Sequence, residues 1–197
     1  MKNKITLLHI ILFQFIFFGS HSAQSLDYRI LKNLNNIQSP ADNNFQKFIS
    51  KTAPPISIAV PVAMIGVGLL DKNKDLTQKG IETGIAFALT VGETYLIKNL
   101  VKRPRPYLTY PDLKNLSTEG SYSFPSGHSS TTFSIATSLS LNYPKWYVIV
   151  PAYLWAGTTG FSRMYLNVHY PSDVLVGAAL GSVTAWATWK INKKLKK

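Results

Sequence analysis

The sequence predicts an all-α protein, a bundle of about five to six helices that crosses a membrane. Hydrophobic residues make up 46% of the chain and charged residues only 15%, which leaves few polar side chains to cover a water-soluble surface. Several apolar runs follow one another, and lysines mark alternate connections between them. A length of 197 residues without a change of composition indicates one domain.

The N-terminus has the pattern of an export signal. Lys2 and Lys4 precede an apolar stretch, which ends in a group of small residues. Residues 1–23 are therefore expected to form a signal peptide that is removed, or a signal anchor that stays, since His21 makes the cleavage site imperfect. In both cases the segment that follows is exported.

The rest of the chain divides into three parts. Residues 24–55 are polar and are expected to form an extramembrane, periplasmic segment with a short amphipathic helix at most. The apolar runs define a helical domain at residues 56–190, and a basic cytoplasmic tail follows at residues 191–197. The expected helices lie at residues 56–70, 81–100, 128–141, 146–160 and 174–189.

Charge placement favours a membrane bundle over the alternative, the buried helices of a soluble exported domain. Consecutive connections of a spanning bundle lie on alternate sides, and Lys and Arg favour the cytoplasmic side. With residues 24–55 outside, the lysines between the first two runs, Lys145 and the basic tail all fall inside. Three arginines depart from this rule and fall on the outer side: Arg103, Arg105 and Arg163. All three lie in connections on one face, where a function can explain their presence.

Composition also narrows the chemistry. The absence of cysteine excludes disulfides, thiolate nucleophiles and Cys-ligated metal sites. The net charge of +12 suits nucleic acid, anionic lipid or an anionic substrate, but topology explains the lysine tail, so no nucleic acid partner is expected. The nine acidic residues form no cluster typical of a magnesium site, so no metal or other cofactor is expected.

Three clusters on the predicted outer face contain residue types that bind phosphate. In the first, Lys98 ends a helical run and Arg105 follows seven residues later. Arginine presents a planar fork of donors that matches phosphate oxygens, and lysine adds a compact charge. Taken alone, this cluster is better explained as an ordinary basic patch at a membrane surface.

The second cluster opens the third apolar run. Ser126 and the backbone N–H groups around Gly127 lie at a helix N-terminus, which attracts anions. His128 would face the same bound group. The alternative is a capped helix with a surface histidine.

The third cluster contains the second histidine beyond the N-terminal segment. His169 follows Arg163 by six residues, and Asp173 follows His169 by four. If Pro171 starts a helix, Asp173 can accept a hydrogen bond from one ring nitrogen and leave the other free to attack.

In order and spacing, the three clusters resemble the motifs of the type 2 phosphatidic acid phosphatase family, and the resemblance covers about residues 98–173. The family shares its core with acid phosphatases and vanadium haloperoxidases. Arg103 forms a second Arg-Pro pair, but Leu96 stands where its partner lysine would be, so the register on Lys98 and Arg105 is preferred.

The resemblance implies a role for each matching residue. His169 attacks phosphorus and forms a phosphohistidine that water then cleaves, Asp173 orients His169, and His128 protonates the leaving oxygen. The phosphate oxygens are then held by five residues: Lys98, Arg105, Ser126, Gly127 and Arg163.

The resemblance also implies a function, a metal-independent phosphatase. The charge pattern predicts that it lies in the bacterial inner membrane with its site on the outer side. The substrate is expected to be a lipid phosphate or diphosphate: undecaprenyl diphosphate, phosphatidylglycerol phosphate, phosphatidic acid and a lipid A phosphate all fit. The alternatives are a soluble periplasmic acid phosphatase, a vanadate haloperoxidase and a non-catalytic lipid-binding membrane protein. The sequence sets no expectation for the oligomeric state. Glu93, inside the second run, is expected to face a polar interface between helices, pair with a cation or line the mouth of the pocket.

Overall fold

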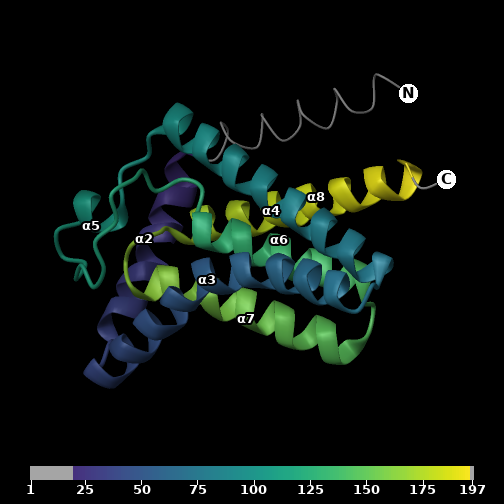
Figure 1. Cartoon of the computed structure of the whole chain (residues 1–197). Helices are drawn as coiled ribbons and strands as arrows, with labels where there is room; N and C mark the ends of the chain where they lie inside the picture. The colour runs from purple at the N-terminus through teal and green to yellow at the C-terminus, as the bar shows by residue number, and fades with distance from the viewer. Residues whose placement is uncertain (1–19, 196–197) are drawn as a thin grey trace.

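The computed structural model describes residues 20–195, which form helices and their connections, without a strand in that range. This confirms the predicted all-α class. Most of the expected signal segment at residues 1–23 lies outside the described residues. The long helices run side by side as a bundle (Figure 1): α3 (Pro40–Leu70), α4 (Lys74–Val101), α6 (Gly127–Asn142), α7 (Trp146–Tyr165) and α8 (Pro171–Leu195).

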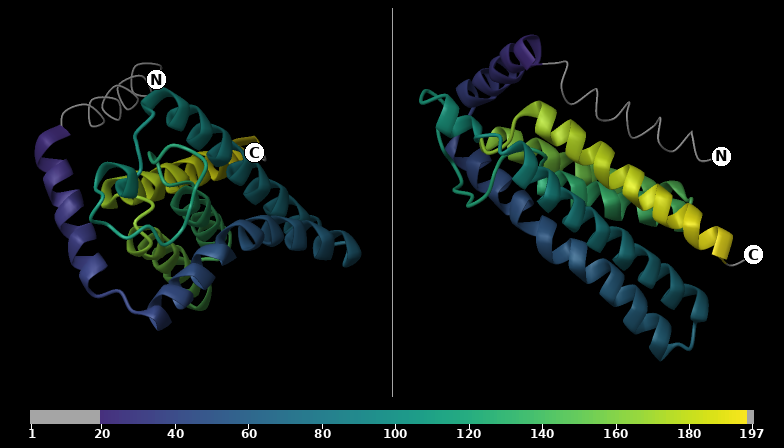
Figure 2. Two further views of the ribbon diagram at one scale, coloured as in Figure 1. Left: turned by 90° about the vertical axis from the view of Figure 1, so that its left-hand side faces the viewer. Right: turned by 90° about the horizontal axis from the view of Figure 1, so that it is seen from above.

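Two further helices lie at one end of the bundle. Helix α2 (Ser20–Asn36) crosses that end, and the single turn α5 (Pro106–Thr109) belongs to the connection between α4 and α6 (Figure 2). This connection and the α7–α8 connection therefore meet α2 at the same end of the molecule.

The segment at residues 24–55 is more helical than the sequence predicted. Helix α2 takes up its first part, and α3 begins at Pro40, where Ser39 Oγ accepts a hydrogen bond from Asp42 N at 3.2 Å. The prediction of a short helix at most was wrong, because α3 continues through Pro54 and Pro55 instead of ending before them. Proline costs a helix one hydrogen bond, but neighbouring helices can compensate, and α3 packs along α4, α6 and α7.

Helix α6 is the centre of the bundle and contacts α3, α4, α7 and α8. Its buried face is built from small side chains, which let other helices come close. On α8, a Cβ at Gly177 would lie 2.6 Å from Ser126 O, and one at Gly181 would overlap Ser130 O. The two glycines therefore allow backbone contact between α6 and α8.

The outside of the bundle suits lipid. Among residues 20–195, α3 and α8 are long and apolar enough to cross a membrane. Large apolar side chains also project from α4 and α8 at the surface: Ile81, Ile85, Leu89, Leu96, Leu100, Leu175, Val183 and Ile191. Glu93 accepts a hydrogen bond from Thr184 Oγ1 at 2.5 Å, so this carboxylate does lie at a polar interface between helices.

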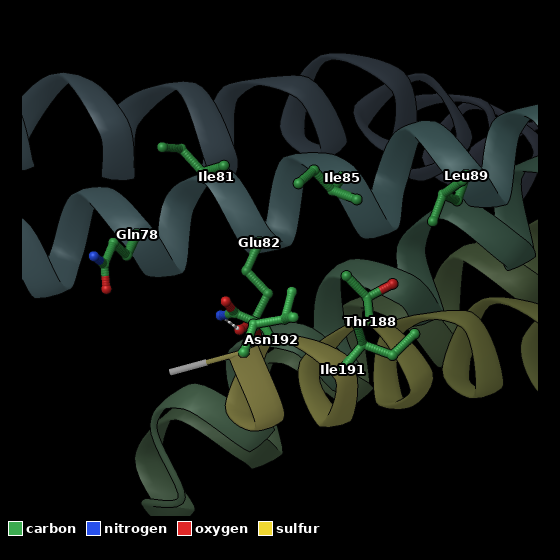
Figure 3. A pocket seen from close by; sticks show the side chains of 9 residues that line it. Gln78, Ile81, Glu82, Ile85, Leu89, Thr188, Ile191 and Asn192 are labelled. Carbon is green, nitrogen blue, oxygen red and sulfur yellow. Dashed lines mark hydrogen bonds between the residues drawn. The ribbon is translucent and has the colours of Figure 1, made fainter. Parts of the chain in front are cut away.

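A groove of about 510 Å³ lies between α4 and α8 (Figure 3). The buried carboxylate of Glu82 borders it and accepts hydrogen bonds from Asn142 and Asn192. Glu82 and Lys98 are separated by about 24 Å along α4. The groove is therefore remote from the predicted site.

Candidate active site

The predicted site residues gather at the end of the bundle that α2 crosses. Lys98 and Arg163 lie in the last turns of α4 and α7, and Asp173 lies in the first turn of α8. Arg105 and His169 come from the two connections at this end. The remaining residues, Ser126, Gly127 and His128, form the start of α6.

His169 lies between an acceptor and a donor. Its Nδ1 is 3.5 Å from Asp173 Oδ2, and its Nε2 is 3.3 Å from Arg105 Nη1. Arginine can only donate, so Nε2 is the acceptor and Nδ1 carries the hydrogen that faces Asp173. Helix α8 begins at Pro171 and brings Asp173 back to His169. The lone pair of the neutral ring is therefore on Nε2.

Burial keeps this ring neutral. His169 is 2% exposed. Loss of solvation lowers the pKa of His169 to about 3, even though the hydrogen bond to Asp173 acts in the opposite direction. A neutral imidazole is the form that can act as a nucleophile.

Asp173 has no exposed surface and accepts further hydrogen bonds. Ser123 Oγ donates to Oδ2, Tyr170 N donates to Oδ2 at 3.0 Å, and Arg103 Nη1 donates to Oδ1 at 2.6 Å. These donors hold the carboxylate in place for His169.

The guanidinium of Arg105 is fixed beside Nε2. Its Nε donates to Ser121 O at 2.8 Å and its Nη1 to Val168 O at 2.7 Å. Burial lowers the pKa of Arg105, but a guanidinium stays charged in proteins. Arg105 thus holds a positive charge next to the ring nitrogen that carries the lone pair.

Arg163 is also buried, at 2% exposure, and forms an ion pair with Glu119 of the α4–α6 connection. It also donates to Ser50 Oγ of α3, while its Nε has no partner among the described residues. Burial would raise the pKa of Glu119, but the charge and hydrogen bond of Arg163 hold it below its ordinary value. An anionic carboxylate therefore occupies donors that could hold a phosphate oxygen.

Lys98 and the start of α6 line a groove together. Lys98 Nζ donates to Tyr122 O at 2.5 Å and to Ser123 O at 3.3 Å. Lys98, Gly127 and His128 border this groove, which has a volume of about 350 Å³. Ser126 is placed differently, since its Oγ accepts from Ser129 N at 3.4 Å as the cap of α6, and its own N donates to Asp173 O at 3.0 Å.

The sequence did not reveal four residues of this region. Ser50, Glu119 and Ser123 belong to no motif and meet the site only through folding. Arg103 forms a second Arg-Pro pair in the sequence, but that pair does not indicate its contacts with Asp27 and Asp173. Within residues 20–195, no three His, Asp or Glu side chains group in a way that could hold a metal ion.

Known proteins match the chain in sequence and in structure. The model for the PAP2 superfamily matches residues 80–197. The lipid A 1-phosphatase of Porphyromonas gingivalis is 28% identical over 163 residues, which are 81% of this chain but only 34% of that protein. The undecaprenyl-diphosphatase of Sulfolobus acidocaldarius is 29% identical over 83% of this chain and 77% of that protein.

A solved structure has the same fold over its full length. The crystal structure of a transmembrane PAP2 type phosphatidylglycerolphosphate phosphatase from Bacillus subtilis is 28% identical, with a TM-score of 0.80. The match covers 100% of this chain and 99% of that one. These relatives are named as phosphatases, in agreement with the enzyme class that the sequence predicted. Since the family model covers more than half of the chain, this protein belongs to the PAP2 superfamily, the family that its three motifs resemble.

Proposed function

We propose that this chain is a membrane-bound phosphatase that hydrolyses a lipid phosphate or diphosphate, without a metal ion, through a phosphohistidine formed on His169. The observation that carries the proposal is the neutral imidazole between Asp173 and Arg105. Its free nitrogen is next to a fixed guanidinium, and two further cations, Lys98 and Arg163, lie at the same end of the bundle.

The reaction has two steps. Nε2 of His169 attacks the terminal phosphorus and a P–N bond forms. The P–O bond to the leaving group, a lipid alcohol or a lipid phosphate, breaks while His128 gives its proton to the leaving oxygen. Asp173 stabilises the positive charge that develops on the ring. Water then attacks the phosphohistidine, His128 takes up a proton, the P–N bond breaks, and inorganic phosphate leaves.

The cations supply what a metal ion supplies in other phosphatases. Negative charge spreads over the phosphoryl oxygens as the transition state forms, and fixed positive groups stabilise it. Arg105 and Arg163 are 3% and 2% exposed, so water screens their charges little.

The shape of the groove supports a lipid substrate. Along α4 its lining changes from Phe87 and Val91 to Lys98, over about 16 Å. Ile58 of α3 and His128 of α6 also line this groove. A phosphate could lie at the cationic end while the first part of an apolar chain extends between α3 and α4 towards the lipid.

Lysine placement supports a site on the outer side of the inner membrane. The α3–α4 turn, the α6–α7 turn and the end of α8 lie at the opposite end of the bundle from the α7–α8 connection, which contains His169 (Figure 1). All three regions contain lysine, which favours the cytoplasmic side. Because the chain has no cysteine, a single new one can report sidedness. An impermeant maleimide should label Thr118→Cys, but not Lys74→Cys, in intact cells; the opposite pattern would contradict this orientation.

Substrate choice is proposed only as a class. The relatives are named for lipid A, undecaprenyl diphosphate and phosphatidylglycerol phosphate, and each presents a terminal phosphate. The decisive experiment measures phosphate release from these lipids and from phosphatidic acid by purified protein. His169→Ala should abolish release while the protein stays folded, and a chelator should leave the wild type active. Undiminished release by His169→Ala would disprove the proposal.

A further inference from the structure

Arg103 connects Asp173 to the helix that crosses the end of the bundle. Its Nη1 donates to Asp173 Oδ1 at 2.6 Å and to Ser172 Oγ at 2.8 Å. Its Nη2 donates to Asp27 Oδ2 of α2 at 2.9 Å. One guanidinium thus bridges two carboxylates, one in the proposed site and one in α2.

The surroundings hold Arg103 in this position. The guanidinium stacks on the ring of Tyr170, with its central carbon 3.7 Å from the ring centroid. The backbone is fixed as well, because Ser123 N donates to Arg103 O at 2.9 Å. Since Ser123 and Tyr170 also donate to Asp173, the same residues position both members of the ion pair.

Asp27 contacts the start of α8 directly. Its Oδ1 accepts from Ser172 N at 3.0 Å and its Oδ2 from Ser172 Oγ at 2.5 Å. Asp27 is 4% exposed and Asp173 is fully buried. A buried carboxylate is costly unless it is paired, and Arg103 is the cation that both share.

The arrangement suggests why α2 is attached here. Without Asp27, Nη2 of Arg103 would lose its acceptor. The guanidinium would then be free to turn away from Asp173. Ser172, the neighbour of Asp173, would lose its acceptor at the same time. Small displacements of Asp173 would alter its hydrogen bond to His169, and reactions depend steeply on such geometry.

We propose that Asp27 and Arg103 are positioning residues, which hold the Asp173 carboxylate against His169, so that α2 completes the active site. This inference depends on the proposed function, because it assumes that His169 and Asp173 act as nucleophile and orienting group. Neither Asp27 nor Arg103 needs to touch the substrate for this role.

The test compares Asp27→Asn with the wild type in phosphate release from a lipid phosphate. Asparagine can still accept from Ser172 but lacks the charge that holds Arg103. We expect kcat to fall about 10- to 100-fold while KM changes less than about threefold. If Asp27 only caps the start of α8 through Ser172, Asp27→Asn should leave kcat unchanged, and this result would contradict the proposal.

A double-mutant cycle separates positioning from general destabilisation. In an Arg103→Gln background, Asp27→Asn should add little further loss, since it acts through Arg103. Independent, additive losses in kcat would overturn the inference. If Asp27→Asn does not fold, Arg103→Lys, which removes the fork but keeps the charge, should show the same selective loss of kcat; an unchanged kcat would again overturn it.

A matched control breaks another contact of α2. Lys32 pairs with Asp112 of the α4–α6 connection at 2.5 Å, and both side chains are well exposed. Lys32→Met should keep kcat within about twofold of the wild type, as is usual for an exposed pair. An equal loss in Lys32→Met would mean that any loosening of α2 impairs activity. If His169→Ala is inactive but Asp27→Asn is fully active, only this inference fails; if His169→Ala is active, the proposed function fails.

Discussion

Nδ1 of His169 faces the buried carboxylate of Asp173 at 3.5 Å, while Nε2 faces the guanidinium of Arg105. This relationship orients the ring, assigns its hydrogen to Nδ1 and leaves the lone pair of Nε2 on the side where cations gather. The first two predictions follow from it.

Asp173→Asn should lower kcat about 10³-fold or more, because an amide can donate to Nδ1 and so favour the wrong tautomer. The measurement is steady-state phosphate release, with thermal unfolding in detergent as the control for folding. A loss below about tenfold would show that Asp173 does not orient the nucleophile.

His169 should stay neutral at pH 5.5. Its pKa is lowered to about 3, so the ring takes up a proton only far below the usual value near 6.5. Ring nitrogen chemical shifts of protein labelled at histidine would report the charge, with His169→Ala used to assign the signal. A titration midpoint near 6.5 would contradict the burial argument.

His128→Ala should impair substrates with a poor leaving group most. An alkyl phosphate needs a proton on its leaving oxygen, whereas nitrophenolate leaves without one, so the first step should slow about 10²-fold or more only for the alkyl ester. Rapid mixing with a nitrophenyl phosphate should still give a burst of nitrophenol. His169→Ala should give no burst, and a burst there would exclude His169 as nucleophile.

Glu119→Gln should strengthen the binding of inorganic phosphate. The Glu119 carboxylate pairs with Arg163 and would compete with a phosphate oxygen for the same donors. Since Glu119 is partly exposed, we expect a gain of about 1 kcal/mol or less, a fall in the inhibition constant of up to about fivefold. Weaker phosphate inhibition in Glu119→Gln would mean that the carboxylate supports the site instead of competing for it.

Gly181→Ala should destabilise the fold by about 1–3 kcal/mol, because a Cβ would overlap Ser130 O of α6. Gly157→Ala on α7 is the matched control, since a Cβ there has no atom within 4 Å. Thermal unfolding in detergent measures both variants. Equal stability of the two would show that α6 and α8 are not in close contact at Gly181.

The sequence alone determined the fold class, the helical runs and the residues of the three motifs. Apolar runs of helical length indicate buried helices. The order of Lys98, His128 and His169 can be read from the sequence. The start of α3 could not be predicted in the same way. Proline marks the end of an isolated helix, and only packing against α4, α6 and α7 outweighs its cost.

Only the tertiary structure decided which groups meet the motif residues. Asp27 is 145 positions before Ser172, from which it accepts, Glu119 is 44 before Arg163, and Ser50 is 113 before Arg163. Such pairs carry no local pattern, because a hydrogen bond depends on distance in space and not along the chain. Arg103 shows the difference most clearly: its type and its Arg-Pro setting are visible in the sequence, but its partners exist only where α2, α4 and α8 come together.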